Sequence, residues 1–297
     1  MQLRKRQKAA EIFLAFSGAA WYDKLYYRDK VIKQRKKTMR IVIKLGTSTL
    51  THPSGNLNIR RVEELCRVLS DLKNAGHEIV LVSSGAIAMG VGKLSLTQRP
   101  QDIPTKQAAA AVGQCELMYI YDKLFSQYHH VVAQLLITAD DIANPARAEN
   151  FHNTLFRLLE LGTLPIINEN DTVATAEMGI GDNDTLGAIV AKTIGADLLV
   201  LLSDIDGLYT ADPHQDPNAV LIPVVKQITA EMERAACGAG SAFGTGGMQT
   251  KLSAAKIATE AGVAMIIANG ARPSILYDWM DGKPVGTKFL PKERHCQ

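Results

Sequence analysis

The sequence contains few cysteines and no cysteine pair. Its 297 residues include four cysteines, which are far apart in the chain: Cys66, Cys115, Cys237 and Cys296. Without a C-x-x-C pair they predict neither a zinc site nor a disulfide framework. Isolated thiols are typical of proteins kept in a reducing compartment. We therefore expect buried, inert cysteines, a cytoplasmic location and no protein-bound metal centre.

Signatures of membrane proteins and of serine hydrolases are also missing. No stretch approaches the ~18 consecutive apolar residues of a membrane span, so we predict no membrane partner. The chain has no G-x-S-x-G motif, and its seven histidines are scattered. These absences argue against a Ser-His-Asp hydrolase.

The net charge of +3 is divided unevenly along the chain. Residues 1–38 hold 11 Lys/Arg and 3 Asp/Glu, a net charge of +8, so the other 259 residues carry −5. A nucleic-acid partner would depend on this basic extension alone, and we predict none. The extension begins like a signal peptide, but Glu11 and the basic run at 30–37 argue against cleavage. We expect residues 1–38 to be poorly ordered and residues 39–297 to form one folded domain.

From Met39 onward, short runs rich in Val, Ile and Leu alternate with segments of helical periodicity. Such runs predict strands that are buried on both faces of a sheet. We expect strands at 40–46, 78–85, 131–138, 164–170, 197–204 and 263–270, and helices at 59–75, 86–92, 105–127, 147–161, 183–194 and 248–261. The alternation predicts a mostly parallel sheet covered by helices on both faces. Ligands of such sheets bind at the carboxyl ends of the strands.

Two of these strand ends combine polar side chains with glycine. Lys44 in "KLGTS" lies within an apolar strand, where an unpaired ammonium group is expensive. Alternatively, the strand is at an edge of the sheet and Lys44 is solvated. In "SSGAIAMG" (83–90), Ser84 and Gly85 precede a helix, a geometry that suits an anion. Alternatively, Ser84 is only a helix N-cap.

A third strand ends in a cluster of amides and carboxylates. "INENDTVATAE" and "GDND" bring together five polar side chains without a basic residue: Asn168, Asn170, Asp171, Asn183 and Asp184. Such groups can hold an ammonium group, orient lysines or lie near a magnesium–nucleotide complex. A polar, turn-rich loop is the alternative interpretation.

Two further glycine-containing motifs lie in the C-terminal half. "SDIDGLYTADP" (203–213) follows an apolar strand, so it is a further candidate for a polar strand end. The alternative interpretation is a hairpin whose turn is Asp206-Gly207. "GTGGMQTK" (244–251) precedes a helix but departs from the P-loop pattern, because Lys251 follows Thr250 and precedes Leu252. Glycines before a helix expose backbone amides to an anion, and Lys251 adds a full positive charge.

Taken together, the motifs predict phosphoryl transfer. Lys44 and Lys251 come from distant segments, and each lies beside a glycine-containing turn. A transferred phosphoryl group carries spread negative charge, so its catalysis depends on positioning and electrostatic stabilisation.

The same motifs, in the same order over residues 39–290, resemble those of the glutamate 5-kinases within the amino-acid kinase family. The stretch from Asn168 to Asp184 is the most specific part. The resemblance implies a three-layer αβα sandwich in which residues 39–297 form the catalytic domain. It also implies ATP-dependent phosphorylation of the side-chain carboxylate of L-glutamate to L-glutamate 5-phosphate, the first step of proline biosynthesis.

Site residues are implied by position in the motifs. The implied catalytic residues are Lys44, Lys251 and Asp184, with the two lysines neutralising phosphoryl oxygens and Asp184 holding the lysines in place. The implied glutamate ligands are Ser84, Asp171 and Asn183. The implied ATP site contains Lys44, Ser203, Asp204, Thr245, Gly246, Gly247, Met248, Gln249, Thr250 and Lys251, with ATP accompanied by Mg²⁺.

The resemblance also implies partners and leaves alternatives open. It implies a homo-oligomer, feedback inhibition by proline and transfer of the product to glutamate-5-phosphate reductase. Many family members carry a C-terminal PUA domain, whereas this chain stops soon after 285–291. One alternative is a sister amino-acid kinase with another carboxylate or phosphate acceptor. The other is a sensor that keeps the fold without turnover, although the presence of both lysines argues against it.

Overall fold

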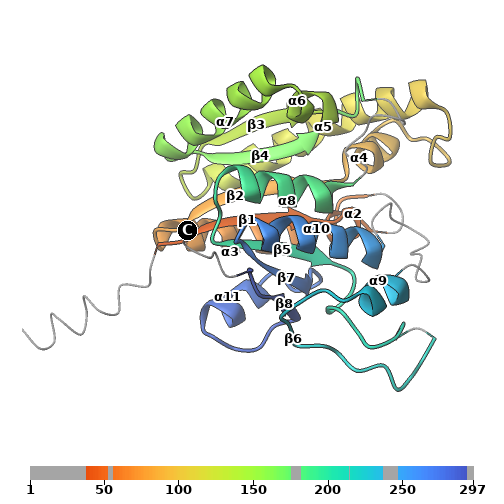
Figure 1. Cartoon of the computed structure of the whole chain (residues 1–297). Helices are drawn as coiled ribbons and strands as arrows, with labels where there is room; N and C mark the ends of the chain where they lie inside the picture. The colour runs from red at the N-terminus through yellow and green to blue at the C-terminus, as the bar shows by residue number, and fades with distance from the viewer. Residues whose placement is uncertain (1–37, 53–55, 175–181, 214, 237–246, 293–297) are drawn as a thin grey trace, which may run out of the picture. The chain divides into compact units, whose positions relative to one another are not determined.

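The computed structural model describes residues 38–52, 56–174, 182–213, 215–236 and 247–292. Met39–Gln297 form one compact unit. Its centre is an eight-stranded sheet with the order β3-β4-β2-β1-β5-β7-β8-β6 (Figure 1). The strands are β1 (Arg40–Leu45), β2 (Glu78–Ser83), β3 (Val132–Ile137), β4 (Leu164–Glu169), β5 (Leu198–Ser203), β6 (Val224–Val225), β7 (Ala264–Asn269) and β8 (Thr287–Phe289).

Most neighbouring strands of the sheet are parallel. β1 lies in the middle and pairs in parallel with β2 on one side and β5 on the other. β8 is antiparallel to β7, so it breaks the parallel pattern near one edge. Val, Ile and Leu dominate β1, β2 and β5, and nearly all residues of these three strands are buried. Burial on both faces is the reason why these runs are continuously apolar.

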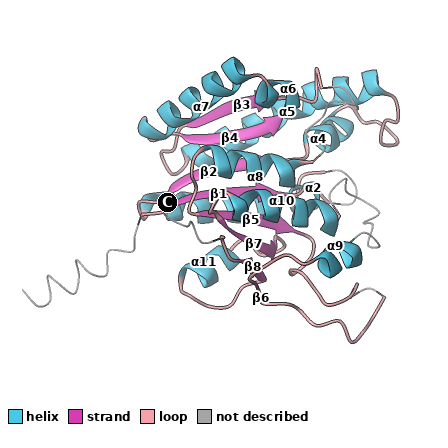
Figure 2. Cartoon of the chain, in the orientation of Figure 1, coloured by secondary structure: helices cyan, strands magenta, loops and turns pink. Residues whose placement is uncertain are grey.

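Helices cover both faces of the sheet (Figure 2). One face packs against α2 (Thr47–Leu50), α3 (Ile59–Asn74), α4 (Ala86–Lys93), α5 (Ile103–Ser126) and α11 (Ile275–Met280). The other face packs against α6 (Ala139–Ala143), α7 (Pro145–Glu160), α8 (Asn183–Thr193), α9 (Ala230–Ala236) and α10 (Met248–Glu260). The αβα sandwich is therefore confirmed.

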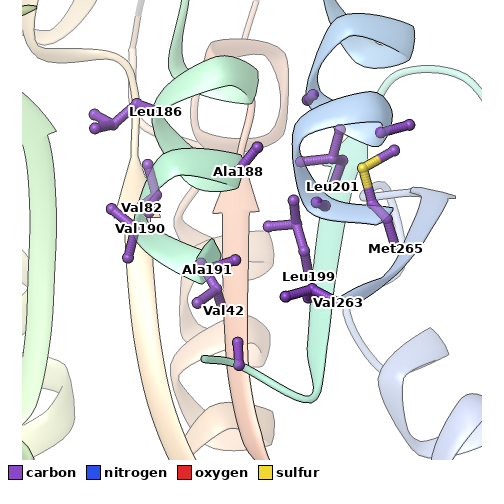
Figure 3. Packing of buried hydrophobic residues seen from close by; sticks show 14 of the residues in the cluster. Val42, Val82, Leu186, Ala188, Val190, Ala191, Leu199, Leu201, Val263 and Met265 are labelled. Carbon is purple, nitrogen blue, oxygen red and sulfur yellow. The ribbon is translucent and has the colours of Figure 1, made fainter. Parts of the chain in front are cut away.

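The core beneath α8 and α10 determines which strand residues face the site. Val42 of β1 packs there with side chains from β2, α8 and β5, including Val82, Val190 and Leu199 (Figure 3). Side chains alternate between the two faces of a strand, so Lys44 points to the same face as Val42. Lys44 therefore lies beneath α8 and α10, in the centre of the sheet. The alternative of a solvated lysine on an edge strand is wrong.

The expected strands and helices are present within a few residues of their predicted bounds. The short elements were not predicted: α2, α6, α9, α11, β6 and β8. They are too short to show a periodic pattern, and β6 and β8 form through pairing in the sheet, β8 with both β6 and β7. Among the described residues, no helix is long and apolar enough to cross a membrane.

Candidate active site

The candidate site lies where the carboxyl ends of the parallel strands meet. β1, β2, β4 and β5 end at Leu45, Ser83, Glu169 and Ser203. Two helices begin beside these ends on one face of the sheet, α8 and α10, and they pack side by side (Figure 1). Gly187 of α8 permits its close approach to β1, because a Cβ atom there would lie 3.3 Å from the Cβ atom of Lys44.

Asp184 lies between the two lysines. Its Oδ1 atom is 2.6 Å from Lys44 Nζ, and its Oδ2 atom is 3.1 Å from Lys251 Nζ. The three residues are buried, with exposed fractions of 0% for Asp184, 7% for Lys44 and 4% for Lys251. A strand, the first turn of α8 and the first turn of α10 thus bring three charges to one point.

The electrostatics of this cluster favour an ionised Asp184. Burial by itself would raise the pKa of the Asp184 carboxyl, but the neighbouring Lys44 and Lys251 ammonium groups lower it, and the net shift is downward. Among the described residues, the two ammonium groups share the Asp184 carboxylate in a place with little water. Ammonium groups in such surroundings attract an anion strongly.

The starts of α8 and α10 add further polar groups to the cluster. Asp182 caps α8, and its Oδ1 atom accepts a hydrogen bond of 2.8 Å from the backbone N–H of Thr185. Gly247 precedes α10 without a side-chain cap. The Thr250 hydroxyl lies 3.1 Å from Asp184 Oδ2 and 2.8 Å from the Gly247 carbonyl, and its one hydrogen is shared between these acceptors. These contacts attach the first turn of α10 to the buried carboxylate.

A second cluster consists of amide and hydroxyl groups. The Nδ2 atom of Asn183 donates to Ser84 Oγ at 2.8 Å and to Asn168 Oδ1 at 2.9 Å. Asn183 directly precedes Asp184, so this cluster adjoins the lysines. Ser84 does not cap α4: the N-cap is Gly85, whose φ of 98° lies in the left-handed region that favours glycine. The N-cap interpretation of Ser84 is therefore wrong.

Asp171 lies just beyond β4 and is partly buried. Burial, followed by the charge of Glu169, raises the pKa of the Asp171 carboxyl to about 6. A carboxylate held in such surroundings is stabilised by a positively charged partner, because an opposite charge offsets both effects.

The residues expected at the nucleotide are only partly described. Ser203 ends β5, and its hydroxyl donates to the exposed carboxylate of Asp204 at 3.0 Å. Gly247, Met248, Gln249, Thr250 and Lys251 surround the start of α10. Thr245 and Gly246 lie outside the described residues, as do residues 175–181 of the polar loop. The turn at Asp206-Gly207 leads to an antiparallel bridge between Tyr209 and Leu221.

Two buried polar residues of α5 contact the site and were missed by sequence reasoning. The Oε1 atom of Gln114 accepts from Asn168 Nδ2 at 2.9 Å, and the hydroxyls of Tyr121 and Ser83 lie 2.9 Å apart. Both residues belong to a long helix whose composition indicates only packing. Their seven-residue spacing, which places them on one helix face, was the only available signal.

The structure is that of an α/β sandwich with two buried lysines at the carboxyl ends of its strands. Proteins of this class can hold a strongly anionic group there. The model of the amino acid kinase family matches residues 39–269. The chain belongs to this family.

Sequence relatives match almost the whole of their own length. The chain is 52% identical to the glutamate 5-kinase of Clostridium perfringens over 265 residues, which cover 88% of this chain and 98% of that protein. It is 53% identical to the glutamate 5-kinase of Listeria innocua over 262 residues, which cover 87% and 95%.

Solved structures share the fold at low identity. Carbamate kinase from Giardia lamblia, bound to AMP-PNP, has a TM-score of 0.62 at 17% identity and covers 86% of this chain and 99% of its own. UMP kinase from Ureaplasma parvum has a TM-score of 0.58 at 15% identity with the same coverage. Two kinases of different substrates thus share this architecture.

Proposed function

We propose that this protein transfers the γ-phosphoryl group of ATP to the side-chain carboxylate of L-glutamate. The product is L-glutamate 5-phosphate, and the reaction is the first step of proline biosynthesis. The main supporting observation is the buried Lys44–Asp184–Lys251 cluster directly beside the Asn183–Ser84 cluster. The names and the high identity of the sequence relatives support glutamate as the acceptor.

The lysine cluster suits the phosphoryl end of the reaction. A carboxylate that attacks a polyphosphate brings two anions together, so the barrier contains strong repulsion. Lys44 and Lys251 would reduce it by binding phosphoryl oxygens, while Asp184 holds both ammonium groups in position. Each ammonium group has three N–H donors, so its bond to Asp184 is compatible with a bond to phosphate. No general base is required, because the glutamate carboxylate is ionised at pH 7.

The amide cluster suits the other end of glutamate. Asp171 would bind the α-ammonium group, and its raised pKa favours a cationic partner. Ser84 and Asn183 would bind through their hydroxyl and amide groups, and Ser84 with its neighbouring backbone amides suits a carboxylate. This division directs the side-chain carboxylate of the substrate towards Lys44 and Lys251.

ATP would enter as its Mg²⁺ complex, with Ser203, Asp204 and the segment 245–251 around the nucleotide. Further parts of the proposal extend beyond the site. They are a homo-oligomer, feedback inhibition by proline, transfer of the labile acyl phosphate to a reductase, a cytoplasmic location, and a division into a basic extension (1–38) and a catalytic domain (39–297).

A trapping assay tests the proposed function. Purified protein with ATP, Mg²⁺ and hydroxylamine is expected to form γ-glutamyl hydroxamate from glutamate, because hydroxylamine captures acyl phosphates. Aspartate and N-acetylglutamate are expected to give far less product. Product only with another acceptor would indicate a sister kinase. ATP binding without product from any acceptor would indicate a sensor, and either result would overturn the proposal.

The binding of glutamate is expected to weaken in mild acid. The pKa of Asp171 is about 6, so this carboxylate is mostly ionised at pH 7.5 and mostly protonated at pH 5. The KM for glutamate should therefore rise as the pH falls through about 6, while the KM for ATP changes less. Steady-state kinetics across this pH range check the prediction. The variant Asp171→Asn should show a high KM with little pH dependence, and an unchanged pH profile in this variant would contradict the assignment.

A further inference from the structure

Helix α5 contacts the candidate glutamate-binding cluster through a buried glutamine. Gln114 is 8% exposed, and its partner Asn168 at the end of β4 is 2% exposed. The bond between Asn168 Nδ2 and Gln114 Oε1 is 2.9 Å long. This bond stabilises the arrangement of the site, because a buried amide without a hydrogen-bond partner carries a desolvation penalty.

The backbone determines the direction of every hydrogen bond in this cluster. The N–H of Glu169 can only donate, and it donates to Asn168 Oδ1 at 2.9 Å. The oxygen of the Asn168 amide is therefore on that side, and its NH₂ group needs an acceptor elsewhere. Gln114 provides that acceptor.

The same reasoning extends to the residues proposed to contact glutamate. The two hydrogens of Asn183 Nδ2 are shared among three acceptors: Asn168 Oδ1 at 2.9 Å, Ser84 Oγ at 2.8 Å and the backbone carbonyl of Ser83 at 3.1 Å. A carbonyl only accepts, so the NH₂ group of Asn183 faces the protein and its Oδ1 atom is directed away from this cluster. Ser84 Oγ accepts from Asn183 and keeps its own hydrogen for donation.

We propose that Gln114 is a positioning residue for glutamate binding. By accepting from Asn168, it holds the amides so that Asn183 presents an acceptor and Ser84 presents a donor to the substrate. Gln114 does not contact the substrate itself. This inference rests on the proposed function, since it assumes that Ser84 and Asn183 bind glutamate.

Two other features keep α5 against this cluster. Tyr121 lies seven residues after Gln114 on the same helix face, and its hydroxyl lies 2.9 Å from Ser83 Oγ, at the end of β2. A Cβ atom at Gly113 would collide with the backbone of Ala86 and Gly90 in α4. The helices α4 and α5 are therefore packed backbone to backbone, so α5 is a rigid support for Gln114.

Kinetics of Gln114 variants test the proposal. Gln114→Leu keeps a similar volume and removes the acceptor, and it should raise the KM for glutamate about tenfold or more. The KM for ATP should change less than about twofold, because the nucleotide residues belong to other elements. Gln114→Glu retains an acceptor oxygen at the same length and should restore the KM for glutamate to within about threefold of the unaltered protein.

A matched variant separates positioning from packing. Leu117→Ala removes a buried apolar side chain from α5, one turn beyond Gln114, and should lower the melting temperature without raising the KM for glutamate. If Gln114→Leu does not fold, Gln114→Met keeps the side-chain length without the amide and should show the same rise. An unchanged KM in an active variant would overturn this inference alone. Absence of glutamate-dependent product from the unaltered protein would overturn the proposed function as well.

Discussion

The variant Lys251→Ala is expected to lower kcat by about 10³-fold. Lys251 Nζ lies 3.1 Å from Asp184 Oδ2, and Lys251 belongs to the first turn of α10, where free helix amides favour an anion. The charge of the phosphoryl group spreads most in the transition state, so the lost ammonium group should affect turnover more than binding. Removal of a single preorganised donor costs about 10²–10³ in other enzymes, and a full charge should reach at least the upper value.

The measurement is hydroxamate formation at saturating glutamate and ATP. The KM for glutamate should change little, because the Asn183–Ser84 cluster remains intact. Lys256→Ala is the matched control: Lys256 belongs to the same helix, is about half exposed and pairs with Glu233 at the surface. This control should keep kcat within about twofold. An unchanged kcat in Lys251→Ala would remove Lys251 from the mechanism.

The variant Asp184→Asn is expected to be nearly inactive and to lose about 3–5 kcal/mol of stability, which is typical when one partner of a buried charged group is removed. Lys44 and Lys251 would then be two buried ammonium groups without the carboxylate that separates them. Asparagine also keeps only one acceptor oxygen and places an NH₂ group in the other position, so it cannot orient both lysines. Denaturant unfolding measures the free energy, and the trapping assay measures turnover.

The pH dependence of stability gives a second signature of Asp184. Its pKa in the folded protein is lowered, so its contribution to stability is fully present above the unfolded pKa of about 3.9. This contribution is lost as the pH falls below about 4 and through the folded pKa. The stability difference between the unaltered protein and Asp184→Asn should therefore shrink at low pH and stay constant from about pH 5 to 8.

ATP should stabilise Asp184→Asn more than the unaltered protein, because the polyphosphate replaces the missing negative charge between the lysines. Thermal melting with and without ATP measures this. Asp182→Asn is the control: it removes the same charge two positions earlier, and Asn is as good a helix N-cap as Asp. A small stability loss in Asp184→Asn, equal to that of Asp182→Asn, would contradict the role of Asp184.

Much of the fold could be predicted from local patterns. Apart from Lys44, the run from Ile41 to Leu45 is apolar, and such a run indicates a strand buried on both faces. The helix α8 and the strand β5 were equally clear, because each segment is long enough to show a pattern of its own. The strand β8, with three residues, had no pattern of its own and forms through its pairing with β7.

The candidate site was predictable as a set of residues but not as an arrangement. Lys44, Asp184 and Lys251 stood out because charged residues beside apolar strands and glycine turns are unusual. Their contacts join segments that are far apart in sequence, such as Asp184 and Lys251, which are 67 positions apart. Gln114 belongs to no motif, because its proposed role depends on its contact with Asn168, which only the folded chain creates.

The sequence by itself determined the alternation of strands and helices, the polar strand ends and the chemistry of two lysines with a carboxylate, because each is written in a short continuous segment. Only the tertiary structure decided that β1 is central, that Asp184 lies between the lysines, and that α5 supports Asn168. The physical reason is that these features depend on strand order and helix packing. Both are set by the burial of the whole core rather than by any one stretch of residues.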